Sequence, residues 1–284
     1  MNILISSNDR YIMPLTVLLQ SIFDHCAAPI NFYFLMADLS TDNQKHLQEY
    51  VEQHQAQITF IPVGDTDFAS LPVKNYISRE TYFRILADEY LPEKVHKVLW
   101  LDADMIVTGD ISALYETELG ELAVAACPHG AAMQPTILEN CKTIGISVPE
   151  QYFNAGMMLC NLDAWRKMDI RKRVQDALSV PHTYAFPGQD LTNLVFNGSV
   201  ITLDWQLYNC MTHSITQENM PYLREHAKII HFVGPAKPWQ FHDLPFADDW
   251  MNYYLESPYG GQSLKRTSYF RMKALYERMG KAIG

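Results

Sequence analysis

The chain has 284 residues, of which 48% are hydrophobic, and a formal net charge of −10 at pH 7. This size and apolar content are enough for one large core or two small ones, so we expect a globular protein. The acidic balance argues against general nucleic-acid binding, because that function needs a basic face that displaces counterions from phosphates. No apolar run is long enough to cross a membrane and the N-terminus lacks a signal-peptide pattern, which predicts a cytoplasmic location. The five cysteines are far apart and form no Cys-x-x-Cys pair, so we expect reduced, partly buried thiols.

Seven apolar runs bounded by polar or turn residues predict buried strands. They cover residues 3–6, 32–36, 58–63, 98–101, 122–126, 157–160 and 229–232. Helical patterns cover residues 11–23 and residues 41–54, where Ser40 or Thr41 would cap the second helix. This alternation predicts an α/β fold with a mainly parallel sheet that helices cover on both faces. In such sheets, ligands bind beyond the carboxyl ends of the strands.

No glycine precedes Gly64 in the chain. The first predicted strand therefore cannot lead into a Gly-x-Gly-x-x-Gly turn or a phosphate-binding P-loop. This absence argues against dinucleotide dehydrogenases and P-loop ATPases.

A hydrophobic run that opens at Val98 ends in two aspartates one residue apart, Asp102 and Asp104. Carboxylates are hard oxygen ligands, and a pair of them suits Mg²⁺ or Mn²⁺ when phosphate oxygens complete the coordination sphere. The pair therefore points to a metal–diphosphate ligand. Aspartates in this pattern are also common in turns and as solvated charge, so the metal interpretation needs a further ligand elsewhere.

A histidine and a lysine lie close together in the segment His-Phe-Val-Gly-Pro-Ala-Lys-Pro-Trp, residues 231–239. His231 stands at the end of a predicted strand, and the Gly-Pro turn would bring Lys237 back over whatever His231 contacts. A single histidine after a strand is usually structural. Together with the aspartate pair, however, the imidazole could be the third metal ligand and Lys237 could neutralise a diphosphate.

This segment resembles the His-x-x-Gly-x-x-Lys-Pro-Trp signature of glycosyltransferase family 8, the family of glycogenin and of bacterial lipooligosaccharide α-galactosyltransferases. Other landmarks follow the family's order: Ser6-Ser7-Asn8-Asp9-Arg10-Tyr11, Thr81-Tyr82-Phe83-Arg84-Ile85, the aspartate pair, Tyr152-Phe153-Asn154-Ala155-Gly156 and Gly188-Gln189-Asp190. The resemblance implies the nucleotide-diphospho-sugar transferase (GT-A) fold, a Rossmann-like sheet without the glycine fingerprint. It also implies retaining transfer of galactose or glucose from a UDP-sugar to a glycan, glycolipid or glycoprotein acceptor, with an α-linkage in the product.

The resemblance further assigns roles to residues around the metal and the diphosphate. Asp102, Asp104 and His231 resemble the family's Mn²⁺ ligands, with Mg²⁺ as the alternative ion. Lys237 and Gly234 resemble its diphosphate contacts, and Lys237 is one of the implied catalytic residues.

Around the sugar and the base, the resemblance implies a second group of contacts. Arg84 resembles the basic residue that touches donor phosphate and sugar, and Asn154 and Ala155 resemble the donor-sugar wall. Gln189 matches the residue on the reactive face of the sugar, and Asp190 matches the neighbouring catalytic carboxylate that contacts sugar hydroxyls. The remaining donor contacts that it implies are Ser6, Asn8, Arg10, Tyr11 and Ala103.

The chain departs from the family's pattern at two places. Close bacterial relatives often carry aspartate where Asn8 stands and asparagine where Arg10 stands, and both positions lie near the uracil. The family usually has Asp-Gln-Asp where this chain has Gly188-Gln189-Asp190, which removes one partner for sugar hydroxyls. The sequence therefore leaves the donor hexose and the acceptor open. Pro187 and Gly188 also suit the start of a helix, and that interpretation is compatible with the functional one.

Retention of configuration requires either a nucleophile beneath the sugar ring or acceptor attack on the face of the leaving group. A glutamine amide is a poor nucleophile, which favours front-face attack, with a UDP oxygen taking the acceptor proton and the Gln189 carbonyl stabilising the cationic ring. Double displacement stays open.

A sugar nucleotidyltransferase is an alternative, but it would be expected to hold its triphosphate with a glycine-rich first loop. A non-catalytic UDP-sugar-binding protein is another, and the intact metal set argues against it.

The last residues form a basic segment on an acidic protein. Residues 262–284 carry six lysines and arginines against Glu277 alone, a net charge of +5 that leaves −15 on the rest. Apolar residues recur there at helical spacing, at Met272, Leu275, Tyr276, Met279 and Ile283. We expect a catalytic domain over residues 1–256 and a basic amphipathic tail over residues 257–284. The tail's composition predicts peripheral association with the inner face of an anionic membrane, and the alternative is a terminal helix that packs on the acidic body.

Overall fold

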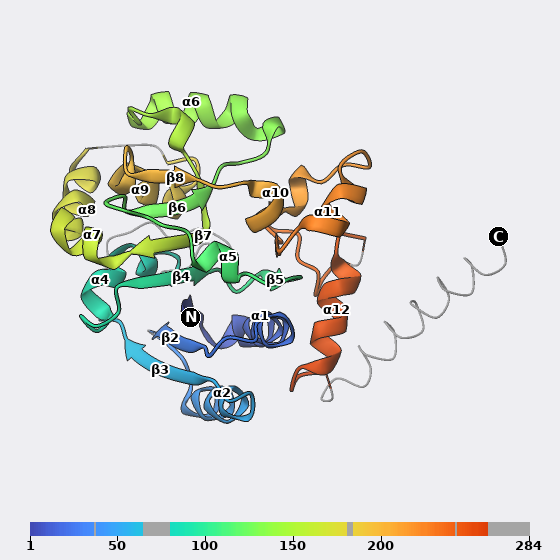
Figure 1. The fold of residues 1–284 in the computed structure, drawn as a ribbon. Helices are drawn as coiled ribbons and strands as arrows, with labels where there is room; N and C mark the ends of the chain where they lie inside the picture. The colour runs from blue at the N-terminus through green and yellow to red at the C-terminus, as the bar shows by residue number, and fades with distance from the viewer. Residues whose placement is uncertain (37, 65–79, 181–183, 242, 261–284) are drawn as a thin grey trace.

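The structure is a computed structural model that describes residues 1–36, 38–64, 80–180, 184–241 and 243–260. The strands of its central sheet are β1 (Asn2–Ser6), β2 (Asn31–Met36), β3 (Gln57–Pro62), β4 (Lys97–Leu101), β6 (Val124–Cys127), β7 (Asn154–Asn161) and β8 (Val200–Thr202). They lie in the order β3-β2-β1-β4-β7-β6-β8 (Figure 1). β7 runs antiparallel to both of its neighbours, and every other pairing in this sheet is parallel. The expected mainly parallel sheet is therefore confirmed.

A second, three-stranded sheet stands beside the first. It contains β5 (Met105–Val107), β9 (Cys210–Met211) and β10 (Ile229–His231), in the order β5-β10-β9. β10 is the strand predicted over residues 229–232, and it pairs antiparallel with β5 rather than joining the central sheet. Because β5 follows the aspartate pair directly, this pairing brings two distant parts of the chain together.

Helices cover both faces of the central sheet, as predicted. They are α1 (Ile12–His25), α2 (Thr41–Gln53), α3 (Glu80–Phe83), α4 (Ala87–Tyr90), α5 (Ser112–Tyr115), α6 (Gln134–Ile144), α7 (Leu162–Met168), α8 (Ile170–Ser179), α9 (Pro187–Phe196), α10 (Trp205–Tyr208), α11 (Met220–His226) and α12 (Ala247–Glu256). Short 3-10 turns are η1 (Asp9–Tyr11), η2 (Arg84–Leu86), η3 (Ala131–Met133), η4 (Pro149–Gln151) and η5 (Thr212–Ser214). Ser40 caps α2, since its hydroxyl accepts a hydrogen bond from the Asn43 amide at 3.4 Å.

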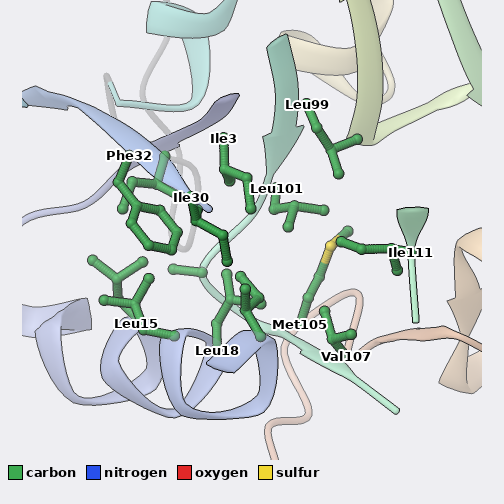
Figure 2. Close-up of a cluster of buried hydrophobic side chains, with 14 of the residues drawn as sticks. Ile3, Leu15, Leu18, Ile30, Phe32, Leu99, Leu101, Met105, Val107 and Ile111 are labelled. Carbon is green, nitrogen blue, oxygen red and sulfur yellow. The ribbon is translucent and has the colours of Figure 1, made fainter. Parts of the chain in front are cut away.

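The two faces of the sheet belong to two separate cores because side chains alternate along each strand. Ile3 and Ile5 of β1 pack on the side of α1, where Leu15 and Leu18 meet them (Figure 2). Leu4 points to the opposite side, in the cluster that contains residues of α4, α7, α8 and α9. A third cluster joins α1, α11 and α12 to the three-stranded sheet. Burial of these apolar side chains fixes the carboxyl ends of the strands in place.

The five cysteines are buried and unpaired, in agreement with the expected thiols. No helix in the described part of the chain is long and apolar enough to cross a membrane. α12 ends at Glu256, and the predicted tail lies from residue 261 onward outside the described residues.

Candidate active site

A cavity of about 660 Å³ opens beyond the carboxyl ends of β1 and β4. Such a position is the usual ligand site of open α/β sheets. All predicted donor and metal residues line it, namely Ser6, Asn8, Arg10, Tyr11, Arg84, Asp102, Ala103, Asp104, Asn154, Ala155, Gln189, His231, Gly234 and Lys237. Gly188, where the chain departs from the family's pattern, lines it as well.

Three predicted metal ligands converge on one side of this cavity. The ligand atoms of Asp102, Asp104 and His231 all lie within 4.8 Å of one another. The backbone amide of Asp102 donates to the carbonyl of Gly156 at 2.9 Å, and the carbonyl of Asp104 accepts from the amide of Phe232 at 3.0 Å. Both aspartates are therefore tied through their backbones to neighbouring strands, which fixes where their carboxylates lie.

Cationic side chains surround the two carboxylates. Arg84 Nη1 lies 3.0 Å from Asp102 Oδ1, which also accepts a hydrogen bond from the indole of Trp100 at 2.8 Å. Lys237 Nζ donates to Asp104 Oδ2, and His231 Nε2 lies 3.3 Å from Asp104 Oδ1. The structure thus brings Lys237 and His231 onto the same carboxylate, as the Gly-Pro turn predicts.

The two carboxyl groups differ in their electrostatic surroundings. Burial raises the pKa of Asp102 above its usual value, and the opposing charge of Arg84 does not cancel that effect. Burial also acts to raise the pKa of Asp104, but Lys237 and His231 outweigh it and hold that pKa below its usual range. Asp104 is therefore ionised at neutral pH.

The turn that returns Lys237 depends on Gly234, which has a φ of 86°. This left-handed conformation strains residues that carry a Cβ, so glycine is the residue that suits it. The ammonium of Lys237 also donates to the carbonyl of Phe232 at 2.7 Å, and its side chain is 7% exposed. A lysine held in this way is a fixed positive charge beside the Asp104 carboxylate.

His231 packs directly against the glycine of β7. A Cβ placed on Gly156 would lie 2.2 Å from His231 Cε1 and 2.9 Å from its Nδ1. The Nδ1 atom of His231 lies 2.9 Å from Oδ1 of the buried Asn209. Because a metal-binding imidazole is oriented by the partner of its other nitrogen, this contact sets the direction of His231.

Gln189 occupies the first turn of α9, and three neighbours fix its amide. Its carbonyl oxygen accepts from Asn154 Nδ2 at 3.0 Å and lies 3.3 Å from His129 Nε2. Its amide nitrogen donates to the hydroxyl of Tyr152 at 2.9 Å. The predicted helix start at Pro187 is also present, so Gln189 belongs to a helix and to the cavity wall at once.

Asp190 lies elsewhere than the resemblance implies. It is fully buried and does not line the cavity, whereas a contact with sugar hydroxyls was expected. Its Oδ1 accepts from Tyr152 and Asn140 at 2.5 and 2.7 Å, and its Oδ2 accepts from the Phe186 amide at 2.8 Å. Because the protein itself supplies these donors, the carboxylate supports the residues around Gln189 instead of facing the cavity.

Three residues near Gln189 were absent from the predicted site. His129 and His213 line the cavity, and their ring centroids are 6.2 Å apart. Burial lowers the pKa of His129 to about 4, although its contact with Gln189 raises it. Asn209 stands behind the cavity wall. None of them belongs to a recognisable motif, so the sequence offered no signal for them beyond their residue type.

Asn8 lies on the side of the cavity that the resemblance assigns to the uracil base. It caps η1, since its side-chain oxygen accepts a hydrogen bond from the amide of Arg10 at 3.1 Å. The ring of Tyr11 meets that of Trp239 edge to face, with centroids 5.8 Å apart. These contacts order the wall that the first strand presents to the cavity.

Comparison with known proteins identifies the family of this chain. The family model "Glycosyl transferase family 8" matches residues 2–243. The structure of the galactosyltransferase LgtC in complex with donor and acceptor sugar analogs is similar, with a TM-score of 0.77 and 27% identity over 91% of this chain and 96% of that one.

Two curated relatives illustrate the range of similar proteins. A putative glycosyltransferase of Haemophilus influenzae is 27% identical over 84% of this chain and 73% of its own length. The lipopolysaccharide 1,2-glucosyltransferase of Escherichia coli K12 is 28% identical over 73% of this chain, which spans 63% of that relative. Since the family model covers most of the chain and the fold and cavity agree with it, the protein belongs to glycosyltransferase family 8.

Proposed function

We propose that this glycosyltransferase moves a hexose from a UDP-sugar to a glycan acceptor, in a metal-dependent reaction that retains the anomeric configuration and forms an α-linkage. The observation that carries the proposal is the convergence of Asp102, Asp104 and His231 beside the fixed charge of Lys237. Family membership supports a nucleotide-sugar donor and a glycan acceptor.

The donor set fits a divalent ion of borderline hardness. Two carboxylates and one imidazole suit Mn²⁺, with Mg²⁺ as the alternative, better than Ca²⁺, which prefers more oxygen ligands. Asp102, Asp104 and His231 would hold the ion, and in that position it would act as a Lewis acid toward the diphosphate. The Asn209 contact supports this assignment, because it leaves Nε2 of His231 directed at the carboxylates.

The chain's own residues supply the remaining chemistry. Lys237 stabilises the negative charge that develops on the departing UDP, since it is preorganised and largely removed from water. The Gln189 carbonyl, held by Asn154 and His129, presents a fixed negative partial charge to the cationic sugar ring. The acceptor attacks on the leaving-group face, and a UDP oxygen takes its proton.

UDP-galactose, and after it UDP-glucose, is the donor that we propose. Relatives that are lipopolysaccharide glucosyl- or galactosyltransferases support these hexoses. The acceptor is a lipopolysaccharide core, another lipid-linked glycan or a glycoprotein, at the cytoplasmic side of the membrane. Hydrolysis assays with UDP-galactose, UDP-glucose and the N-acetylhexosamine donors would test the donor, and turnover of a non-uridine donor alone would contradict it.

Calorimetry of UDP binding with and without Mn²⁺ tests the metal site. Asp102→Ala, Asp104→Ala and His231→Ala should each lose the Mn²⁺-dependent part of UDP affinity, because each removes one of three ligands. Asp42→Ala and His96→Ala change the same residue types at exposed positions outside the cavity and should bind as wild type does. Unchanged UDP–Mn²⁺ affinity in all three ligand variants would overturn the assignment.

A further inference from the structure

Asn209 connects the metal ligands with the residues around Gln189. It is fully buried, follows α10 and does not line the cavity. Its Oδ1 lies 2.9 Å from Nδ1 of His231, and its Nδ2 lies 3.0 Å from Oδ1 of Asn154. Asn154 in turn contacts Gln189 at 3.0 Å. Asn209 therefore stands between the two functional parts of the cavity.

The direction of every hydrogen bond in this series follows from one backbone group. The amide of Gly156 can only donate, so the atom of Asn154 that it meets at 3.0 Å is the oxygen. That same oxygen faces Asn209, which must therefore present its amide nitrogen there and its oxygen to His231. Since an amide oxygen only accepts, Nδ1 of His231 carries a hydrogen.

The other end of the series is fixed in the same way. With its oxygen toward Gly156 and Asn209, Asn154 presents its nitrogen to Gln189, whose carbonyl oxygen accepts. Gln189 then donates from its nitrogen to Tyr152, and Tyr152 donates to Asp190, which accepts. No bond in the series conflicts with another, so a single orientation of each side chain satisfies all of them.

We propose that Asn209 is a positioning residue that sets two features of the site together: the direction of His231 Nε2 toward the two aspartates, and the orientation of the Gln189 carbonyl. Its oxygen accepts a hydrogen bond from Nδ1–H of His231, which leaves Nε2 as the nitrogen that can bind a metal. Its nitrogen holds Asn154, which holds Gln189. This inference rests on the proposed function, because it assigns Asn209 a part in metal binding and in turnover.

The two roles use different atoms of one side chain, so substitutions can separate them. Asn209→Asp keeps an oxygen that accepts from His231 and removes the nitrogen that donates to Asn154. Asn209→Leu removes both groups at similar volume. Asn161→Asp is the matched control, because it makes the same chemical change at the N-cap of α7, outside the cavity lining.

The test measures Mn²⁺ affinity of the UDP complex by calorimetry and kcat and KM for UDP-sugar hydrolysis. Asn209→Asp should retain Mn²⁺ affinity and lose kcat with little change in KM. Asn209→Leu should also lose Mn²⁺ affinity by about 10–100-fold, as is typical when the hydrogen-bond partner of a metal-binding histidine is removed. Asn161→Asp should leave all three unchanged. In the wild-type protein, ¹⁵N NMR of the His231 ring should show a hydrogen on Nδ1.

Three results would overturn the proposed role of Asn209. Equal Mn²⁺ affinity in all Asn209 variants, an unchanged kcat in Asn209→Asp, or a hydrogen on Nε2 alone in the wild type would each overturn it. The NMR measurement needs no variant, so it decides the tautomer even where a substitution prevents folding. A wild-type protein without Mn²⁺-dependent UDP binding would instead count against the proposed function.

Discussion

Gly156 shapes the proposed metal site in two ways. It belongs to β7, and its lack of a side chain lets the ring of His231 lie against the strand. Its amide also sets the direction of the hydrogen bonds that pass through Asn154. One backbone position thus determines both where the imidazole lies and which of its nitrogens carries the hydrogen.

Gly156→Ala should therefore damage the metal site more than the fold. The new Cβ would lie 2.2 Å from His231 Cε1, so the ring must leave its position beside the aspartates or the strand must shift. Overpacking of this kind typically costs about 1–3 kcal/mol of unfolding free energy. We expect a lower melting temperature and a loss of Mn²⁺-dependent UDP affinity. Gly109→Ala is the control, since the three atoms nearest its Cβ belong to the flexible side chain of Lys228. A Gly156→Ala protein with wild-type Mn²⁺-dependent UDP affinity would contradict this prediction.

Gln189 provides a second prediction at the scale of one residue. Gln189→Ala should lower turnover by a few orders of magnitude and leave UDP-sugar affinity nearly unchanged, because the group acts mainly in the transition state. Steady-state hydrolysis and calorimetry measure the two quantities separately. An equal loss of donor affinity would show that Gln189 has a structural role at the start of α9.

His129 should make the folded protein sensitive to mild acid. Its pKa is about 4 in the folded protein against a usual value of 6.5, so the unfolded chain binds the proton more readily as pH falls. Between pH 7 and pH 5 this linkage removes about 2 kcal/mol of unfolding free energy, and the loss continues until pH falls below the folded value. Urea unfolding at both pH values should show a smaller loss for His129→Gln than for wild type. Equal losses of unfolding free energy in the two proteins would contradict the interpretation that His129 is buried as a neutral imidazole.

At the scale of elements, the apolar runs predicted β10 and six strands of the central sheet, and the helical patterns predicted α1 and α2, whereas β5, β8 and β9 were not predicted. Runs such as residues 32–36 and 98–101 are apolar on consecutive positions, and the structure places β2 and β4 there. β5, β8 and β9 have three, three and two residues, which is too short for a periodic pattern. The antiparallel direction of β7 and the place of β10 in a separate sheet depend on which strands pair in the folded protein. The local sequence pattern of a strand does not reveal its pairing partner.

The same distinction applies to the site. The aspartate pair and the His231 segment stand out because each follows an apolar run and uses residue types with a specific chemistry. Asn209 and His129 contact residues that the fold brings to them from distant positions in the chain. The sequence around each of them therefore does not indicate that it belongs to the site. The unexpected burial of Asp190 has the same origin, since Tyr152 and Asn140 reach it only in the folded protein.

β10 offers a test of how far the second sheet supports the site. Ile230 is fully buried beside Ile106 and Val17 in the third core cluster. Ile230→Ala should lower the free energy of unfolding by about 2–5 kcal/mol, as expected for a large-to-small core substitution. Urea unfolding measures this loss, and Ile61→Ala, at a half-buried position of β3, should cost less. A smaller loss of unfolding free energy for Ile230→Ala than for Ile61→Ala would contradict the view that the third core cluster supports the strand that carries His231.

At the scale of the whole molecule, the charge distribution leads to a prediction about location. We propose that the basic tail binds anionic lipid, since each basic residue near such a surface contributes about 1 kcal/mol. Truncation before Ser263 should abolish sedimentation with anionic vesicles and spare UDP-sugar hydrolysis. Vesicles of neutral lipid are the control, and a truncated protein that still sediments would contradict the membrane role. The tail lies outside the described residues, so its sequence alone supports this proposal.

The pairing of β10 with β5 also determines when the proposed metal site can form. Asp104 and Lys237 are 133 residues apart in the chain, yet they share one ion pair. Because a ribosome delivers the N-terminal part first, the two aspartates emerge long before the imidazole and the lysine that complete their surroundings. A nascent chain that stops before β10 has the first strands of the sheet and no complete ligand set. The proposed metal site can therefore form only late in synthesis, after His231 and Lys237 have left the ribosome.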